Sequence, residues 1–191
     1  MEKKVKKIVI IGPESTGKST LCTELAAHYN SVWVKEYART YLEKNGTNYT
    51  YESLYEIGKG QISEEEITYQ LLKTDTAFKN DVPLFIDTNL YVIKVWSEFV
   101  YNKCDNRILS EIVIREYDLY LLCNTDLPWV KDNLREYPDL VTRQKLFSYY
   151  KEEMIEQKVP WAIISGNKEE RLKNAINIIE EKFYFSRNGT L

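Results

Sequence analysis

The chain alternates short apolar stretches, rich in β-branched and aromatic residues, with longer segments that show helical periodicity. Such alternation is typical of a parallel sheet with helices on both faces. Leu21, Leu25 and Tyr29 repeat every four residues, which predicts an amphipathic helix that faces the core. We expect strands at residues 5–11, 31–35, 83–87, 118–123 and 161–165. The predicted fold class is therefore α/β, a three-layer sandwich around a five-stranded parallel sheet.

The segments between the strands predict further helices. Residues 36–80 are largely helical, but the step Gly58-Lys59-Gly60 interrupts the pattern, and Ser63 with Glu66 forms an S-x-x-E capping box. We therefore expect a kink or a new helix start there. Other helices are expected at 89–101, 106–116, 140–157 and 168–182.

Residues 124–139 contain three Asp and two Pro without a clear period, so we expect a loop with a mobile flap. We call residues 126–143 the lid. With 191 residues and 43% hydrophobic content, the chain is expected to form one domain over residues 1–185, followed by a frayed tail at 186–191.

Charge and composition exclude some partners. Acidic residues outnumber basic ones by 29 to 26, which argues against a nucleic-acid partner. No stretch approaches the roughly 18 apolar residues that a membrane span needs, so no membrane partner is expected. The three cysteines have no metal-like spacing and suit a reducing cytoplasm, where we expect the protein to act. The oligomeric state is left open.

Residues 12–19 read Gly-Pro-Glu-Ser-Thr-Gly-Lys-Ser, a Walker A pattern that lies directly after an apolar run and before a helix. Its two glycines let backbone N–H groups converge on phosphate oxygens. Lys18 supplies charge to the outer phosphates, and Ser19 offers a hydroxyl to Mg²⁺. We expect ATP and Mg²⁺ as cofactors. The expected nucleotide-binding residues of this loop are Gly12, Glu14, Ser15, Thr16, Gly17, Lys18, Ser19 and Thr20.

Asp87 ends a strand that is predicted to be buried, the position from which P-loop proteins hold Mg²⁺. The alternative is that Asp87 caps the following helix. Thr88 follows it, where ATPases that hydrolyse for mechanical work usually carry a second acid to orient water. The missing acid favours transfer to a bound acceptor.

Four charged residues are candidates for the transfer step. Glu36 follows the second predicted strand, and Arg39 lies three residues on, so both could face an acceptor or form a surface ion pair. Arg135 and Arg143 belong to the predicted lid and could close over ATP or remain solvated.

Taken together, several motifs resemble one family. They are Gly-Pro-Glu-Ser-Thr-Gly-Lys-Ser-Thr-Leu, Glu36-Tyr-Ala-Arg39, Gly58-x-Gly60-Gln61, Asp87-Thr-Asn with Lys94-Val-Trp96, Pro128-Trp129 through Leu134-Arg135, and Gly166-Asn-x-Glu-Glu-Arg171. In this order they are similar to the ribosylnicotinamide kinase domain of NadR-type NAD-salvage proteins. We also expect a match to an AAA-type ATP-binding domain.

The resemblance implies a P-loop kinase-like fold and phosphorylation of nicotinamide riboside by ATP, which gives nicotinamide mononucleotide and ADP. By position it implies catalytic roles for Lys18, Glu36, Arg39, Asp87, Arg135 and Arg143, and metal binding by Ser19 and Asp87. Gly166 and Asn167 would edge the adenine pocket. The implied substrate-binding residues are Glu36, Tyr37, Arg39, Gln61, Asp87, Asn89, Trp96 and Trp129.

Two features limit the resemblance, and two alternatives stay open. Multifunctional members carry an adenylyltransferase domain ahead of the kinase, which this sequence does not show, and Asn89 stands where an acid is also common. A kinase of another nucleoside or nucleotide would share every role except the acceptor pocket. An ATP-binding regulatory module with slow hydrolysis is the second alternative; guanine switching is disfavoured because no N-K-x-D motif follows a later strand.

Overall fold

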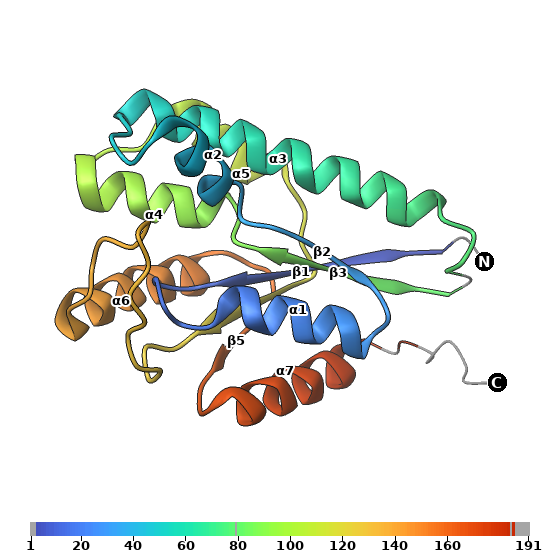
Figure 1. The fold of residues 1–191 in the computed structure, drawn as a ribbon. Helices are drawn as coiled ribbons and strands as arrows, with labels where there is room; N and C mark the ends of the chain where they lie inside the picture. The colour runs from blue at the N-terminus through green and yellow to red at the C-terminus, as the bar shows by residue number, and fades with distance from the viewer. Residues whose placement is uncertain (1–2, 79, 184, 186–191) are drawn as a thin grey trace.

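A five-stranded sheet runs through the centre of the protein (Figure 1), and all its strand pairs are parallel. This computed structural model describes residues 3–78, 80–183 and 185. The strand order is β2-β3-β1-β4-β5, which confirms the predicted α/β class with five parallel strands. The strands are β1 (Val5–Ile11), β2 (Val32–Val34), β3 (Val82–Asp87), β4 (Leu119–Cys123) and β5 (Trp161–Ile164).

The two strands that flank β1 are buried along their whole length. Every residue of β3 and β4 is buried, as expected for a parallel sheet that is covered on both faces. In the register, Ile10 of β1 lies between Asp87 of β3 and Leu121 of β4. The carboxyl ends of these three strands therefore meet at one edge, where the segments that follow β1, β3 and β4 can form a shared site.

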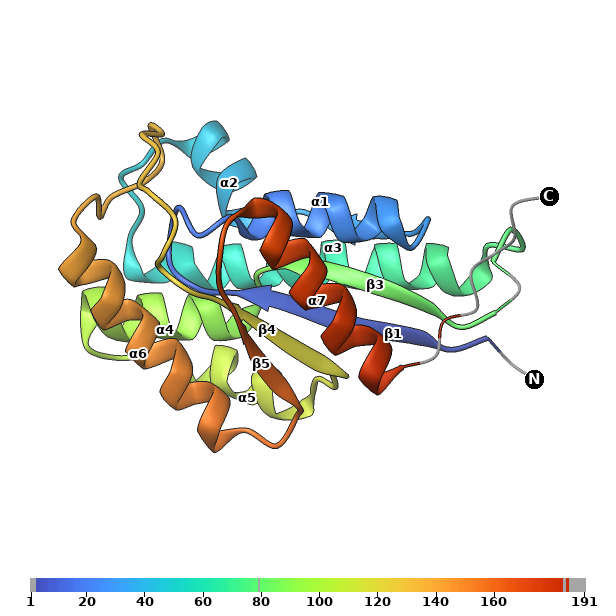
Figure 2. The same ribbon diagram turned by 90° about the horizontal axis from the view of Figure 1, so that it is seen from below.

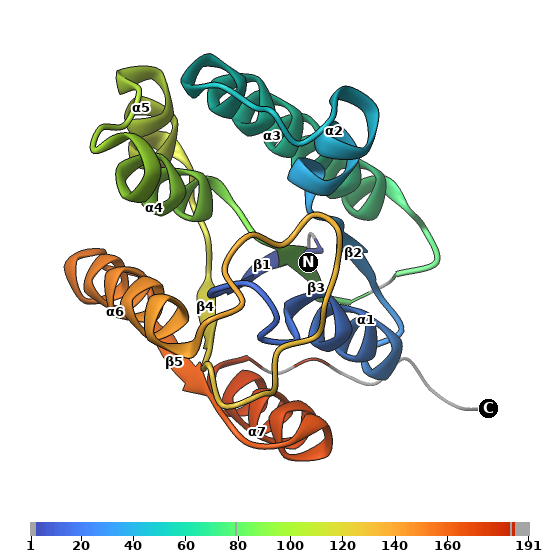
Figure 3. The same cartoon turned by 60° about the vertical axis from the view of Figure 1, so that its left-hand side comes forward.

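Helices cover the two faces of the sheet (Figures 2 and 3). One face packs against α1 and α7, whose buried residues include Leu25 and Ile179. The other packs against α3, α4 and α6, and α2 and α5 complete a smaller cluster beside α3 and α4. The helices are α1 (Lys18–His28), α2 (Tyr37–Asn45), α3 (Tyr51–Thr74), α4 (Leu90–Tyr101), α5 (Asn106–Ile114), α6 (Leu140–Glu156) and α7 (Lys168–Lys182).

The prediction of a new helix start at Ser63 was wrong. Helix α3 continues unbroken through Gly58 and Gly60, and the interruption lies earlier, at Gly46, where φ is +83°. A capping box does start α3, but it is formed by Thr50 and Ser53. Gly60 serves close packing, because a Cβ there would lie 2.0 Å from the ring of Tyr37 on α2.

The segment between β4 and α6 has no regular secondary structure and crosses the carboxyl ends of the strands (Figure 3). It forms most of the predicted lid, and its mobility stays a prediction. The predicted tail at 186–191 lies outside the described residues. In the described part of the chain, no helix is long and apolar enough to cross a membrane.

Candidate active site

The phosphate loop connects β1 to α1 at the centre of the sheet. Gly12 has φ +138°, and a Cβ at this position would lie 2.7 Å from the carbonyl oxygen of Cys123. Gly17 has φ +79° and starts α1 without a side-chain cap, while α1 has no acidic residue in its first turn. The Lys18 ammonium lies in the loop and donates to the Pro13 carbonyl at 2.9 Å. The loop therefore combines a helix N-terminus, with its backbone N–H groups, and a cation, the features of a phosphate site.

Asp87 lies at the end of β3, beside this loop, and is 1% exposed. Burial raises its pKa to about 7, the nearby charge of Glu36 adds to the rise, and Lys18 and a hydrogen bond with Ser19 oppose it. Its Oδ1 atom is buried without a hydrogen-bond partner among the described residues. An unpartnered carboxylate oxygen next to a serine hydroxyl fits the oxygen ligands that Mg²⁺ prefers.

The helix cap that was the alternative for Asp87 is provided by Asn89 instead. The Asn89 side chain accepts from the Tyr91 N–H at 3.1 Å and donates to the Tyr120 hydroxyl at 3.0 Å. Thr88 lies between Asp87 and Asn89, and its φ of +68° is unusual for a β-branched residue. This turn separates Asp87 from α4 and leaves its carboxylate available to the site. Asn89 is buried and does not line the pocket described next.

A continuous pocket joins the phosphate loop to the first turn of α2 and to α4 and α6. Of the predicted residues outside the loop, it is lined by Glu36, Arg39, Trp96 and Arg135. The structure adds residues that the sequence did not single out, notably Tyr49, Glu136 and Tyr150. Their residue types alone do not identify them as site residues, because aromatic side chains are more often part of a core and acidic ones part of a solvated surface.

Asp87, like Asn89, is not among the residues that line this pocket. The predicted substrate residues Tyr37, Gln61 and Trp129 also lie outside it and support its walls. Gln61 on α3 accepts from the Tyr37 N–H at 2.9 Å, which fixes the start of α2. The Tyr37 ring fills the space that Gly60 leaves. Trp129 lies beneath the guanidinium groups of Arg135 and Arg143, at 5.8 and 5.7 Å from its ring centroid.

Glu36 and Arg39 do not form the surface ion pair that the spacing allowed. Arg39 instead donates to Asp132 of the lid at 2.9 Å and lies 3.9 Å from Glu43. The backbone N–H of Leu134 and the Arg39 guanidinium lower the pKa of Asp132. Arg39 therefore connects α2 to the lid while Glu36 stays close to Asp87.

The two lid arginines differ in their surroundings. Arg143 is 2% exposed and donates to the carbonyl oxygens of Glu14, Ser15 and Leu127 at 3.3, 3.2 and 3.2 Å. It therefore ties the lid to the phosphate loop. Arg135 lines the pocket and donates to the Val130 carbonyl at 2.5 Å. Arg135 is the lid guanidinium that is better placed to meet a bound phosphate.

Glu14 was predicted to bind the nucleotide, but its side chain contacts the lid. Its carboxylate accepts from the backbone N–H groups of Glu136 and Tyr137 in the lid, at 3.0 and 3.2 Å. A carboxylate so engaged is directed to the lid, which leaves the backbone of Glu14 as its contribution to the phosphate loop.

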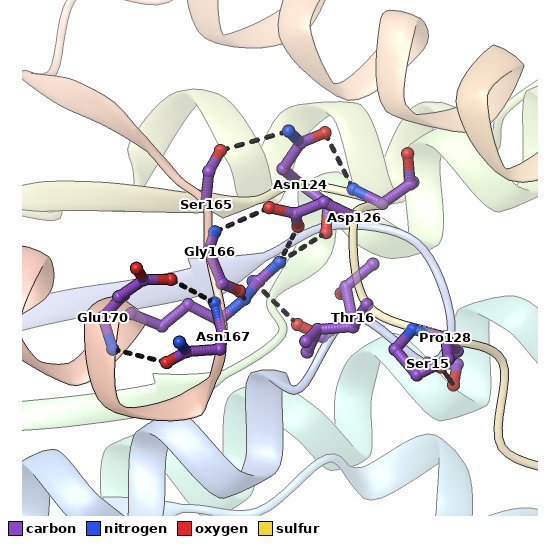
Figure 4. Close-up of polar contacts among 12 residues, drawn as sticks. Ser15, Thr16, Asn124, Asp126, Pro128, Ser165, Gly166, Asn167 and Glu170 are labelled. Carbon is purple, nitrogen blue, oxygen red and sulfur yellow. Dashed lines mark hydrogen bonds and ion pairs between the residues drawn. The ribbon is translucent and has the colours of Figure 1, made fainter.

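Figure 4 shows the predicted adenine edge, where Gly166 and Asn167 lie near Asn124 and Asp126. Arg171 of α7 joins three segments there. Arg171 donates to the carbonyl oxygens of Gly166, Thr16 and Asn124 at 2.8, 3.0 and 3.0 Å, and it forms an ion pair with Asp126. Asn167 caps α7 together with Glu170. This role of Arg171 could not be predicted, because Thr16 lies 155 residues away along the chain.

The sequence is similar to that of larger curated proteins. A family model described as an AAA domain matches residues 7–171. The proteins named trifunctional NAD biosynthesis/regulator protein NadR from Salmonella typhimurium and Escherichia coli are each 27% identical to the chain, over 159 and 161 residues. These alignments cover 80% of the chain and 36% of each relative, so the chain spans about a third of their length.

The fold is similar to that of several solved structures. A NadR protein in complex with NR has a TM-score of 0.75 at 20% identity, with coverage of 100% of this chain and 53% of that chain. A NadR protein in complex with NAD and AMP-PNP has a TM-score of 0.67 at 20% identity, with coverage of 99% and 52%. Thymidylate kinase from Candida albicans has a TM-score of 0.66 at 14% identity, with coverage of 93% and 92%.

A phosphate loop between a central parallel strand and a helix, with a buried aspartate on the neighbouring strand, defines a P-loop nucleotide-binding protein. The solved structures confirm the predicted P-loop kinase-like fold. The chain belongs to the AAA domain family, whose model covers most of its length. The predicted resemblance to NadR-type proteins is confirmed in sequence and fold.

Proposed function

We propose that the protein is a kinase that transfers the γ-phosphoryl group of ATP to a hydroxyl of nicotinamide riboside. The observation that carries the proposal is the continuous pocket, which joins the phosphate loop to a separate wall formed by α2, α4 and α6. An enzyme that only hydrolyses ATP needs room beside the γ-phosphate for one water molecule. This wall instead carries aromatic rings, such as Trp96, that suit a planar base. The NadR relatives and the NadR structure with NR support this acceptor.

The proposed roles follow from position in the pocket or, for Asp87, from its place beside the phosphate loop. Lys18 neutralises charge on the outer phosphates, and Arg39 and Arg135 add charge from the acceptor and lid sides. Glu36 and Asp87 are both candidates for the group that orients the acceptor hydroxyl and accepts its proton. Because the charge of Glu36 acts on Asp87, we expect only one of these two carboxylates to act as the base.

The proposed reaction uses Mg²⁺ together with ATP. Ser19 and Asp87 would hold the ion, because the hydroxyl and the unpartnered carboxylate oxygen lie side by side. When bound, Mg²⁺ would neutralise charge that develops on the phosphate oxygens. The cytoplasmic location expected from the cysteines stays a prediction. The proposed function is the kinase reaction alone and does not include the regulator activity that the name of the NadR relatives mentions.

A substrate panel tests the proposed function. ADP formation is measured with ATP, Mg²⁺ and, in turn, nicotinamide riboside, uridine, thymidine and nucleoside monophosphates. We expect turnover that depends on the acceptor and is fastest with nicotinamide riboside. Lys18→Ala should abolish this turnover, because the outer phosphates lose their cation, which costs several kcal/mol in the barrier.

Two results would contradict the proposal in different ways. Faster turnover with another acceptor would keep the kinase but replace its substrate. ADP formation that ignores every acceptor would favour the regulatory module, and near-normal kcat in Lys18→Ala would contradict the phosphate site itself.

A further inference from the structure

The phosphate loop carries an acidic side chain at a place where a free carboxylate would repel the phosphates. Glu14 lies two residues after Gly12, and like charges a few ångströms apart repel strongly in a partly buried site. The carboxylate is directed to the lid, where it accepts from the Glu136 and Tyr137 N–H groups at 3.0 and 3.2 Å. Burial raises the pKa of Glu14, and these two hydrogen bonds and the charge of Lys18 oppose the rise.

The lid residues whose N–H groups bind Glu14 also pack against the acceptor wall. The Tyr137 ring packs edge-on against Trp96 and Phe99 of α4, with centroid distances of 5.5 and 5.4 Å. Glu136 lines the pocket together with Tyr49. A shift of the backbone at 136–137 therefore moves the side chains that face the acceptor.

The rest of the lid is tied to the phosphate loop elsewhere. Arg143 donates to the Glu14 and Ser15 carbonyl oxygens, and the Ser15 hydroxyl accepts from the Val130 N–H at 2.9 Å. These contacts fix the two ends of the lid and the loop backbone. The Glu14 carboxylate instead contacts residues 136 and 137, the stretch of lid that packs against the acceptor wall.

We infer that Glu14 is a positioning residue that couples the two substrate sites: its carboxylate, together with the N–H groups of Glu136 and Tyr137, holds the acceptor wall in register with the phosphate loop. The inference rests on the proposed function. Because this contact joins the donor loop to the acceptor wall, binding at one site favours binding at the other. Coupling of this kind is reciprocal, so each substrate raises the affinity for the other by the same factor.

Amide hydrogen exchange tests the contact itself. We would compare the wild-type protein with Glu14→Gln and Glu14→Ala, and use Glu56→Gln, an exposed charge on α3, as the matched control. Exchange at residues 136 and 137 should accelerate about tenfold or more in Glu14→Ala. The acceleration should be smaller in Glu14→Gln, because both N–H groups donate to one oxygen of Glu14 and the uncharged amide oxygen can still accept them. Amides of β1 and α6 should be unchanged, which shows that the variants fold.

Binding measurements test the coupling. The Kd of nicotinamide riboside is measured with and without AMP-PNP and Mg²⁺. We expect the analogue to tighten acceptor binding about fivefold or more in the wild type and in Glu56→Gln, and to have little effect in Glu14→Ala. In steady-state kinetics the variant should raise the KM for the acceptor more than the KM for ATP.

The two measurements separate this inference from the proposed function. Unchanged exchange at residues 136 and 137 in both Glu14 variants would overturn the contact, and equal coupling in the wild type and Glu14→Ala would overturn its role. If the wild type binds none of the tested acceptors, the proposed acceptor fails instead, while hydrogen exchange still decides whether Glu14 holds the lid.

Discussion

Two buried carboxylates, Asp87 and Glu65, show how position decides what burial does to a charged side chain. Each has one oxygen without a hydrogen-bond partner among the described residues, and burial raises each pKa to about 7. Asp87 lies beside Lys18 and Ser19, where a metal ion can use the free oxygen. Glu65 lies on the buried face of α3, where its other oxygen accepts from the Tyr117 hydroxyl at 2.8 Å. Asp87 therefore serves the site, and Glu65 affects mainly stability.

Glu65 predicts a dependence of stability on pH. Its pKa rises from 4.5 to about 7 on folding, so between these values the folded protein binds more protons than the unfolded one. The free energy of unfolding should fall as pH rises through this window and then level off. Glu65→Gln should remove this contribution and add on the order of 3 kcal/mol at pH 8.

Urea unfolding at pH 5 and at pH 8 measures this effect. Glu64→Gln, at an exposed position on the same helix, is the control and should retain the wild-type dependence. Equal free energies of unfolding for Glu65→Gln and the wild type at pH 8 would show that Glu65 is not destabilising when ionised.

Glu36→Gln tests the acceptor side of the site. Because the variant loses the carboxylate while keeping the shape, kcat should fall by roughly 10²–10⁴-fold if Glu36 accepts the proton. The KM for ATP should change little, since the proposed role of Glu36 is on the acceptor hydroxyl and not on the phosphates. Glu43→Gln, at an exposed position of α2, is the control. A loss confined to ATP binding would mean that Glu36 belongs to the donor side.

At the scale of elements, α3 shows where sequence reasoning fails. Its glycines were interpreted as a kink or a new helix start, because a glycine in a helix interior is unfavourable by roughly 1 kcal/mol. The structure shows that Gly60 allows α2 to approach closely, and α2 carries Glu36 and Arg39. Such a contact joins residues that are distant in sequence, so local propensity cannot reveal it.

Gly60→Ala should therefore displace residues of the site, although Gly60 does not line the pocket. The added methyl would lie 2.0 Å from the Tyr37 ring, so α2 must shift. We expect a loss of about 1–3 kcal/mol in unfolding free energy and a lower kcat/KM for the acceptor. Gly58→Ala is the matched variant, since its methyl meets the end of the Leu90 side chain at 3.2 Å. Equal effects of the two variants would contradict this packing role.

At the scale of the whole molecule, the parallel sheet explains what could be predicted. The phosphate loop and Asp87 follow strands whose ends meet at one edge, so strand assignments alone place them together. The contacts of the lid could not be predicted in this way. Glu14 and Glu136 lie 122 residues apart, and no sequence pattern sets their approach.

The whole fold should respond to nucleotide. A ligand that binds the folded state alone stabilises it by about 2.7 kcal/mol at 100 times its Kd. For a chain of this size AMP-PNP with Mg²⁺ should raise Tm by roughly 5–10 °C, as read by differential scanning fluorimetry. Lys18→Ala should lose most of this shift. A full shift in the variant would show that the nucleotide binds elsewhere.

The central claim is that one pocket passes a phosphoryl group from ATP to nicotinamide riboside. The most direct test is the ratio of two products, nicotinamide mononucleotide measured by mass spectrometry and ADP measured in the same reaction. The structure predicts one nicotinamide mononucleotide for each ADP, and little ADP when the acceptor is left out. ADP that accumulates without the phosphorylated riboside would contradict the claim.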